Sequence, residues 1–281
     1  MSLFATDTLS LSQSWHLTAS ARYNHTKVTN RDHITATGSN ASLSGDHHFN
    51  RVNPSLGITY TPNDQLSVFG SYSESNRAPT SIELGCANPD VPCKLPNAMA
   101  GDPPLNQVVA KTYETGLRGK LTETFKWNTS IYRTMNHDDI HFIQSSTIGG
   151  SLGYFDNVGR TKRQGFDLGL TGVIDKLFLR AGYSFVSAKY DSDLTLINEV
   201  NSTAGEDGEF QVRKGNYLAG IPKHQFKLRA QYEVLPKWTV GTNVVYYSDQ
   251  FVHGNDNNSH VSGALTPGKL SGYTVVNLDT Q

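Results

Sequence analysis

The sequence predicts an all-β fold, an antiparallel up-and-down transmembrane β-barrel, of which this chain holds only part, about 11 strands. Three observations predict it. Apolar and polar residues alternate with a period of two through most of the chain, the connections alternate between very short and very long, and aromatic residues gather near the predicted strand ends.

Composition and charge narrow the class of protein. The net charge is -1, so no broad positive field is available for nucleic-acid phosphates, and no nucleic-acid partner is expected. The abundance of Gly, Tyr and Phe beside few Met residues favours strands and turns over helices. No run of 18 or more apolar residues occurs, which argues against a membrane-spanning helix.

The alternation is clear from the first predicted strand to the last. In residues 15–23 every second residue is apolar, from Trp15 to Tyr23, and the residues between them are polar or charged. The same pattern recurs in segments 166–170, 177–185, 225–234 and 238–246. Each segment is therefore predicted to be a strand with one apolar and one polar face.

The lengths of the connections favour a membrane barrel over a soluble sandwich. Barrels of the bacterial outer membrane join their strands by tight periplasmic turns and longer outer loops. Short turns are predicted near residues 12–14, 62–64, 122–124, 175–176 and 235–237, and long polar loops near 29–48, 76–108, 145–153, 191–214 and 249–268.

Aromatic residues are placed as an interface between membrane and water would require. Rings with a polar atom favour the headgroup zone, and they flank the apolar band of outer-membrane barrels. Ordinary strand aromatics are the alternative explanation. The residues concerned are Trp15, Phe125, Trp127, Phe178 and Trp238 beside short turns, and Tyr72, Tyr190, Tyr246 and Tyr247 toward long loops.

The start of the chain carries no secretory signal, although an exported protein needs one in its precursor. We therefore expect the sequence to be a piece of a longer protein, with residues 1–3 either a cloning remnant or an arbitrary start. A barrel piece has two unpaired strand edges, so we expect that it is no functional transporter by itself.

Several motifs resemble one family. Segments 71–80, 83–84, 103–105 and 111–119 resemble the barrel of TonB-dependent outer-membrane receptors in content and order. Segments 154–159 and 163–167 look like the family's Tyr-x-Asn-x-Gly and Gly-x-Glu strand, with Asp167 where Glu is usual. Segments 221–225 and 272–278 match two later strand openings, so the likeness covers nearly the whole chain.

The resemblance implies more than the pattern itself establishes. It implies a barrel of about 22 strands, closed around an N-terminal plug domain, in the cell outer membrane of a Gram-negative bacterium. It also implies energy-coupled import of a ferric siderophore, cobalamin or another scarce nutrient. The energy would come from the inner-membrane protein TonB, which would contact an N-terminal part of the whole protein. Residues 1–281 then form a partial barrel domain, with plug and last strands absent.

The two cysteines, Cys86 and Cys93, lie in the longest predicted loop. A disulfide between them is expected in an exported protein, because the periplasm is oxidising. Metal binding is the weaker alternative, since no further Cys or His stands at zinc spacing.

The histidines suggest a metal site only weakly. His137 and His141 are predicted to share a strand face, and at about 3.3 Å per residue they would stand roughly 13 Å apart, too far to hold one ion. We therefore predict no metal and no cofactor.

Basic and imidazole side chains at loops and loop-strand junctions are the candidate ligand-facing residues. Many ferric siderophore complexes are anionic, so attraction to such residues is physically sensible. Ordinary solvated loop charge remains the alternative. The candidates are Arg31, His47, His48, Arg77, Arg160, Lys162, Arg163, His253 and His260.

No enzymatic activity is predicted, because the sequence has no Gly-x-Ser-x-Gly elbow, no His-Glu-x-x-His and no Gly-x-x-x-x-Gly-Lys phosphate loop. The leading hypothesis is a ligand-gated outer-membrane importer. The alternatives are a passive porin, a surface lipase or protease built on a barrel, and a soluble β-rich adhesin or binding module.

Overall fold

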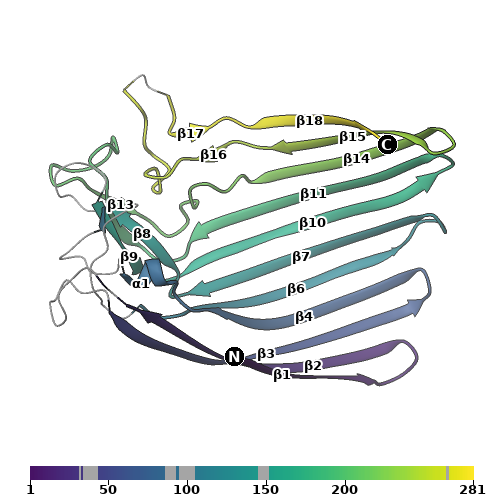
Figure 1. The fold of residues 1–281 in the computed structure, drawn as a ribbon, viewed down its shortest axis with the longest axis horizontal. Helices are drawn as coiled ribbons and strands as arrows, with labels where there is room; N and C mark the ends of the chain where they lie inside the picture. Colours follow the sequence, from purple (N-terminus) through teal and green to yellow (C-terminus); the bar gives the residue numbers. More distant parts are fainter. Residues whose placement is uncertain (32, 34–43, 86–92, 95–104, 145–151, 264–265) are drawn as a thin grey trace.

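The computed structural model describes residues 1–31, 33, 44–85, 93–94, 105–144, 152–263 and 266–281. Its main feature is one 11-stranded sheet, and all neighbouring strands are antiparallel (Figure 1). The strands follow one another across the sheet in chain order: β1 (Ser2–Ser10), β2 (Trp15–Asn30), β3 (Gly45–Asn63), β4 (Leu66–Arg77), β6 (Val108–Lys120), β7 (Phe125–His137), β10 (Thr161–Ile174), β11 (Leu177–Tyr190), β14 (His224–Leu235), β15 (Trp238–Tyr247) and β18 (Tyr273–Thr280). The predicted all-β, up-and-down strand order is confirmed.

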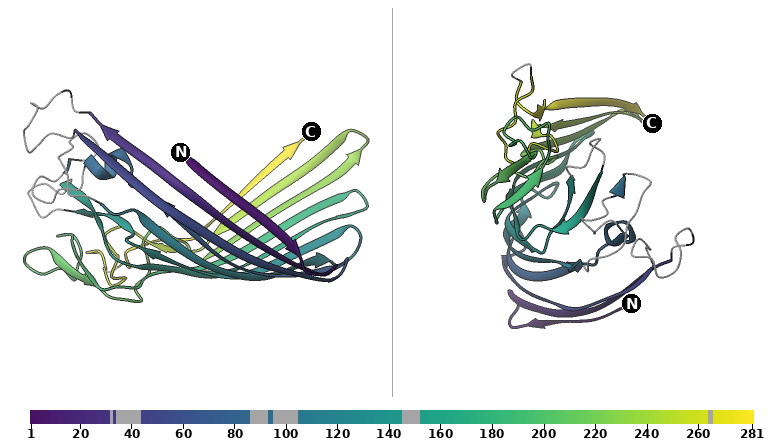
Figure 2. Two further views of the ribbon diagram at one scale, coloured as in Figure 1. Left: turned by 90° about the horizontal axis from the view of Figure 1, so that it is seen from below. Right: turned by 90° about the vertical axis from the view of Figure 1, so that its left-hand side faces the viewer.

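The sheet curves into an open trough, and β1 and β18 form its two edges (Figure 2). Short connections lie at one end of the trough, called the turn end here, and the long ones at the other, the loop end (Figure 1). Among the described residues, no helix is long and apolar enough to span a membrane.

The two faces of the sheet differ in chemistry. On β10, Phe166, Leu168 and Leu170 share one face, and Leu168 pairs with Tyr183 on β11. The side chain of Leu168 is 47% exposed although it lies in the middle of its strand. We call this convex side the outer face. The opposite, concave side is the inner face, where Ala188 packs against the loop-end elements.

The short turns lie close to where the sequence predicts them. Ile174 pairs with Leu177, which leaves Asp175 and Lys176 as a two-residue turn between β10 and β11. Asp175 has φ 50°, in the left-handed region that two-residue hairpin turns require. The positive φ of 67° at Lys237 serves the same purpose between β14 and β15.

The long loops contain structure that the sequence did not reveal. β8 (Ile140–Gln144) and β9 (Leu152–Asn157) form a small sheet with β5 (Cys93–Lys94), and β12 (Leu194–Ile197) pairs with β13 (Glu209–Val212). A further pair joins β16 (Gln250–Phe251) to β17 (Lys269–Leu270), and a short helix, α1, covers Ser81–Gly85.

Three sequence expectations need correction. His137 and His141 do not share a strand, because β7 ends at His137 and Asp138, with φ 54°, turns the chain before β8 begins. Tyr190 is not an interface ring, because it is 1% exposed and packs in a buried cluster. Residues 45–48 belong to β3 and not to the preceding loop, because they continue its ladder with β2.

Buried apolar side chains of the described residues gather at the loop end. The larger cluster includes Tyr190, Phe210 and Val212, and the smaller one includes Leu84 and Val108. No second sheet stacks against the outer face of the described sheet, so its apolar residues are not the inside of a soluble sandwich.

Candidate functional site

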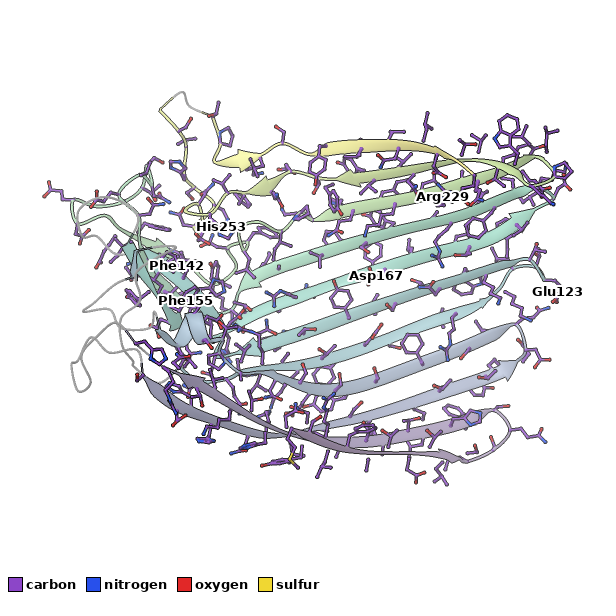
Figure 3. All side chains as sticks on the ribbon, viewed as in Figure 1. Glu123, Phe142, Phe155, Asp167, Arg229 and His253 are labelled. Atoms are coloured by element: carbon purple, nitrogen blue, oxygen red, sulfur yellow. The ribbon has the colours of Figure 1, made fainter. Side chains whose placement is uncertain are left out.

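A cavity of about 530 Å³ lies at the loop end, where Figure 3 labels Phe142, Phe155 and His253, three of the residues that line it. Its lining comes from five elements that are far apart in the chain: β8, β9, the last residue of β11, the β12–β13 hairpin and the loop before residue 257. Its lining residues are Ile140, His141, Phe142, Ile143, Phe155, Tyr190, Leu196, Ile197, Asn198, Phe210, His253, Gly254 and Asp256.

Phe142 and Phe155 form an aromatic wall. They are directly paired across β8 and β9, and their rings meet edge to face with centroids 5.3 Å apart. The neighbouring position on β9 must be glycine, because a Cβ at Gly153 would collide with the Phe142 ring. The wall therefore depends on a small residue placed diagonally across the two strands.

Tyr190 and Asp256 connect the barrel wall to the loops. The Tyr190 hydroxyl donates a hydrogen bond of 2.8 Å to Oδ1 of Asp256, and the backbone N–H of Gly254 donates to Oδ2 at 3.1 Å. The ring of Tyr190 lies 5.6 Å from that of His141. One side of the cavity is therefore held to the end of β11 through Tyr190.

The buried carboxylate of Asp139, the residue before β8, ties the start of β8 to β7 and β10. Oδ2 of Asp139 accepts hydrogen bonds from the Thr161 hydroxyl at 2.5 Å and from the Asn136 amide at 3.4 Å, and it lies 3.7 Å from Nε2 of His141. Burial would raise the pKa of Asp139, but hydrogen bonds from His141 and Thr161 and the positive charge of Arg163 hold it well below its usual range.

Two asparagines hold in place the loop that contributes His253, Gly254 and Asp256 to the cavity lining. The Asn255 side chain is 1% exposed; its amide donates to the carbonyl of Gly268 at 2.8 Å, and its Oδ1 accepts from the backbone N–H of His260. The Asn201 amide donates to the carbonyl of Gly254 at 2.7 Å. These bonds satisfy loop backbone groups that no strand partner reaches.

The chemistry of the cavity lining favours a ring-bearing, hydrogen-bonding ligand. Its walls are aromatic and aliphatic, and its polar groups include His141, His253 and Asp256. No lysine or arginine is among the described residues that line it. Attraction to a bulk negative charge must come from the surrounding loops and not from the cavity walls.

Of the nine predicted ligand-facing residues, His253 is the one that lines this cavity. Figure 3 shows it across from Phe142 and Phe155 at the loop end. His260 instead ties two loops together, since its Nδ1 accepts a hydrogen bond of 2.9 Å from the backbone N–H of Ser202.

Two predicted arginines are held in ion pairs. Arg31 directly follows β2, and its guanidinium nitrogen lies 3.3 Å from a carboxylate oxygen of Asp46 on β3. Arg77 donates to Oε2 of Glu83 at 2.7 Å, and Glu83 also accepts from the backbone N–H of Thr80, as in a capping box at the start of α1.

Arg160 directly precedes β10 and Arg163 lies within it, and neither is among the residues that line the cavity. Nε of Arg160 is 3.9 Å from Asp191, a carboxyl whose pKa burial would raise but the Lys214 ammonium lowers. Arg163 pairs with Ala188 on the inner face, close enough to Asp139 to lower its pKa.

Lys162, His47 and His48 all lie within strands. Lys162 lies directly opposite Lys189, and its face is that of Phe166 and Leu168. His47 pairs with Val28, and the ring of His48 is 5.9 Å from that of His25. Of the predicted disulfide, Cys86 lies outside the described residues and only the backbone of Cys93 is described, in β5, so the bond stays a prediction.

Sequence reasoning missed most of the cavity. Phe142, Phe155 and Phe210 lie in segments that looked like irregular loop or ordinary strand. The Asn-rich run at 255–258 was the one local signal available, since asparagine side chains bond readily to nearby backbone.

Comparisons with known proteins agree with this architecture. A family model described as "TonB dependent receptor-like, beta-barrel" matches residues 1–280. The chain is 28% identical over 283 residues to the probable TonB-dependent siderophore receptor PiuA of Acinetobacter baumannii, covering all of this chain and 35% of that protein. It is 25% identical over 236 residues to the ferric-pyoverdine M114 receptor PbuA of Pseudomonas sp. strain M114, covering 81% of this chain and 23% of that protein.

Solved structures show the same fold. The crystal structure of PiuA from A. baumannii superposes with a TM-score of 0.65 at 21% identity, covering 99% of this chain and 36% of that one. The structure of the copper transporter OprC gives a TM-score of 0.70 at 14% identity, covering 99% of this chain and 39% of that one.

These four matches are named as receptors or transporters, not as enzymes. The chain spans about a third or less of the length of the curated relatives named here. Because the family model covers almost every residue, the chain belongs to the TonB-dependent receptor-like β-barrel family.

Proposed function

We propose that the whole protein is an energy-coupled receptor of the cell outer membrane that imports a ferric siderophore, and that residues 1–281 form a partial barrel domain of it. The match of the family model over residues 1–280 carries this proposal. In it, outer-membrane lipid surrounds the outer face, and TonB supplies energy through an N-terminal part of the whole protein.

The loop-end cavity supports ligand capture on the far side of the membrane. Long loops face outward in outer-membrane barrels, so the cavity opens toward the external medium in this orientation. Its ring-lined walls suit a flat organic group, and packing of such a group against the wall formed by Phe142 and Phe155 excludes water from the face that it turns to them. In this proposal, Arg160 and Arg163 at the start of β10 help to attract an anionic iron complex to the loop end.

Ligand gating requires that binding change the loop end. The Tyr190–Asp256 hydrogen bond joins the wall to the loop that carries His253, so a ligand in the cavity contacts both. In this proposal, ligand binding at the loop end changes the barrel wall through the Tyr190–Asp256 hydrogen bond.

The test uses the full-length protein. Titration with a panel of purified ferric siderophores, followed by tryptophan fluorescence, should show saturable binding of at least one, and cells carrying the receptor should take up its radiolabelled iron only while the inner membrane is energised. Uptake that continues without energy would indicate a passive pore instead. Absence of both binding and uptake across the panel would reject the siderophore assignment.

A double variant and a matched control test whether the ligand binds in the cavity. Replacing both rings, Phe142→Ala with Phe155→Ala, should weaken binding at least tenfold, because each loses its stacking surface (about 0.5–1.5 kcal/mol per ring pair beyond area burial). Phe166→Ala removes an equal ring from the outer face, far from the cavity, and should leave affinity unchanged. Equal effects of the two changes would exclude the cavity as the binding site.

A further inference from the structure

Two neighbouring rows of residues on the inner face, toward the turn end, are rich in cations. Each row crosses β6, β7, β10, β11 and β14 through direct cross-strand partners. The first row is Arg118, Asn128, Gly169, Gly182 and Lys227, and the second is Lys120, Lys126, Thr171, Arg180 and Arg229. Six of these ten positions hold lysine or arginine and none holds an acidic residue. We call the six cations the inner basic belt.

The belt is a local feature and does not follow from the overall charge. The chain as a whole has 24 lysines and arginines against 25 acidic residues. On the same inner face, Asp167 lies one row nearer the loop end than Gly169, and Figure 3 shows it farther from the turns than Arg229. Glu114 lies one row beyond Asp167. The sign of the charge therefore changes along the inner face within one row, about 6.6 Å.

The belt is neutralised only in part. Arg229 is fixed, because both of its terminal nitrogens donate to the carboxylate of Asp279, one of them at 2.8 Å. Lys120 lies 3.9 Å from Glu123, a turn residue whose side chain is 87% exposed. Among the described residues, no side-chain ion pair or hydrogen bond is found for Lys126, Arg180 or Lys227.

A groove of about 560 Å³ on the inner face is lined by part of this belt. Its floor is the directly paired Gly169 and Gly182, which bring no side chain. A Cβ at Gly182 would meet no atom nearer than 3.9 Å, so the groove is open above it. The polar lining includes Arg180, Lys227, Arg229, Asn128 and Asn243. Positive charge together with amide donors suits an anionic, oxygen-rich ligand.

A bound anion would relieve a repulsion within the belt. Arg180 is the direct partner of Arg229 across β11 and β14, and like charges in that position repel. Asp279 neutralises Arg229 but leaves Arg180 without a carboxylate of its own among the described residues. An anion in the groove would supply the missing charge to Arg180 and Lys227 together.

The groove and the loop-end cavity complement each other. They are similar in size, about 560 and 530 Å³, and both volumes are typical of small-molecule sites. The cavity has aromatic walls and no lysine or arginine among its described lining residues, whereas three cations line the groove. A ligand of one size therefore finds ring contacts at the loop end and counter-charge nearer the turn end.

We propose that this groove is a second, transient binding site for the anionic iron complex, which the complex reaches after the loop-end cavity on its way to the periplasm. The inference rests on the proposed import function. In that proposal an N-terminal domain occupies the interior at rest, so the complex enters the groove only during import. The groove should therefore govern the rate of import and not the affinity at the cell surface.

The test uses full-length receptor in cells and three radiolabelled iron complexes: the anionic ferric tris-catecholate and ferric citrate, and an uncharged ferric tris-hydroxamate. Binding is measured on de-energised cells and initial uptake on energised cells. Arg180→Gln with Lys227→Gln should lower the maximal uptake rate of an imported anionic complex on the order of tenfold, because a charged cleft raises the local ion concentration by about that factor or more. The surface affinity of that complex should not change.

Three further variants separate charge, space and general damage. Arg180→Lys with Lys227→Arg keeps both charges and should keep the uptake rate. Gly182→Leu fills the open floor of the groove and should slow uptake without altering surface affinity. Arg133→Gln with Lys189→Gln removes one arginine and one lysine from the outer face and should have no effect.

Undiminished uptake by the glutamine variant, or an equal loss in the outer-face control, would overturn the proposal. Faster proteolysis of the N-terminal part in the glutamine variant would also overturn it, since the groove would then hold that domain in place. Wild type that binds and imports none of the three complexes would reject the proposed function and this inference with it. Import of the uncharged complex alone would reject only the inference.

Discussion

The barrel wall and the loop end use apolar residues in opposite ways. On the wall, Leu168 and Ile131 expose 47% and 59% of their surface in the middle of long strands. At the loop end, Val212 and Phe210 expose 0% and 3%. The wall therefore needs a non-aqueous solvent to cover it, whereas the loop end packs its own small core as a protein in water does.

This difference separates the two sources of stability. The wall is held by a continuous antiparallel ladder, in which each strand bonds only to its neighbours. The loop end is held by packing and by side-chain bonds between segments far apart in the chain, such as Tyr190 to Asp256. A change in one region should leave the other largely intact, and four predictions test that separation in the full-length protein.

The largest effect is expected from Phe210→Ala. The ring lies in the larger buried cluster and lines the cavity, so its loss should cost about 3–5 kcal/mol of local stability. Hydrogen exchange should show faster opening at the loop end and unchanged protection in β6 and β7. Uniform loss of protection over both regions would mean that they do not fold as separate units.

The next largest effect is expected on the wall. Leu168→Arg places a charge on the outer face in mid-strand and should cost about 2–4 kcal/mol in lipid, measured by urea titration of folding into vesicles. Gln225→Arg, on the inner face of β14, is the matched control and should cost far less. Equal costs would mean that the outer face does not meet hydrocarbon.

A smaller effect concerns the buried carboxylate below the cavity. Asp139→Asn should cost the loop end about 1–3 kcal/mol, because three partners lose a charged acceptor. Since folding lowers the pKa of Asp139 from 3.8, its contribution is present above that pH and is lost as pH falls through the folded value.

Hydrogen exchange at two pH values checks this. Loop-end protection should fall on acidification in wild type and less in the Asp139→Asn variant. Glu206→Gln, a change at an exposed loop carboxyl, should behave as wild type does. An unchanged acid response in the Asp139 variant would assign that response to another group.

The smallest effect is expected at α1. Thr80→Ala removes the hydroxyl that accepts from the backbone N–H of Glu83 at 3.2 Å and should cost about 1 kcal/mol. Faster exchange confined to residues 81–85 is the expected readout, while Thr80→Ser should restore protection. Spread of the effect to β4 would show that the cap also holds the wall.

Much of the wall could be predicted from the sequence. Period-two alternation located all the segments quoted for it, and the two-residue turn at Asp175 and Lys176 was placed to the residue. Such features depend on neighbours in the chain or on the adjacent hairpin strand. They fail where the chain turns without a familiar signal, as at Asp138, whose positive φ ends β7.

The cavity could not be predicted in this way. His253 was among the expected residues, but Phe142, Tyr190 and Asp256 were not expected to meet it. The Phe142 segment carries no alternation long enough to predict a strand, and the burial of Tyr190 depends on loops more than 20 residues away in the chain.

The sequence by itself determined the strand period, the alternation of turn and loop lengths and the apolar outer stripe, because side-chain direction along a strand depends only on position in that strand. Tertiary structure alone decided which loops meet and which rings enclose the cavity. Those contacts join residues distant in the chain, and their energies depend on packing and burial that arise only once the sheet has curved.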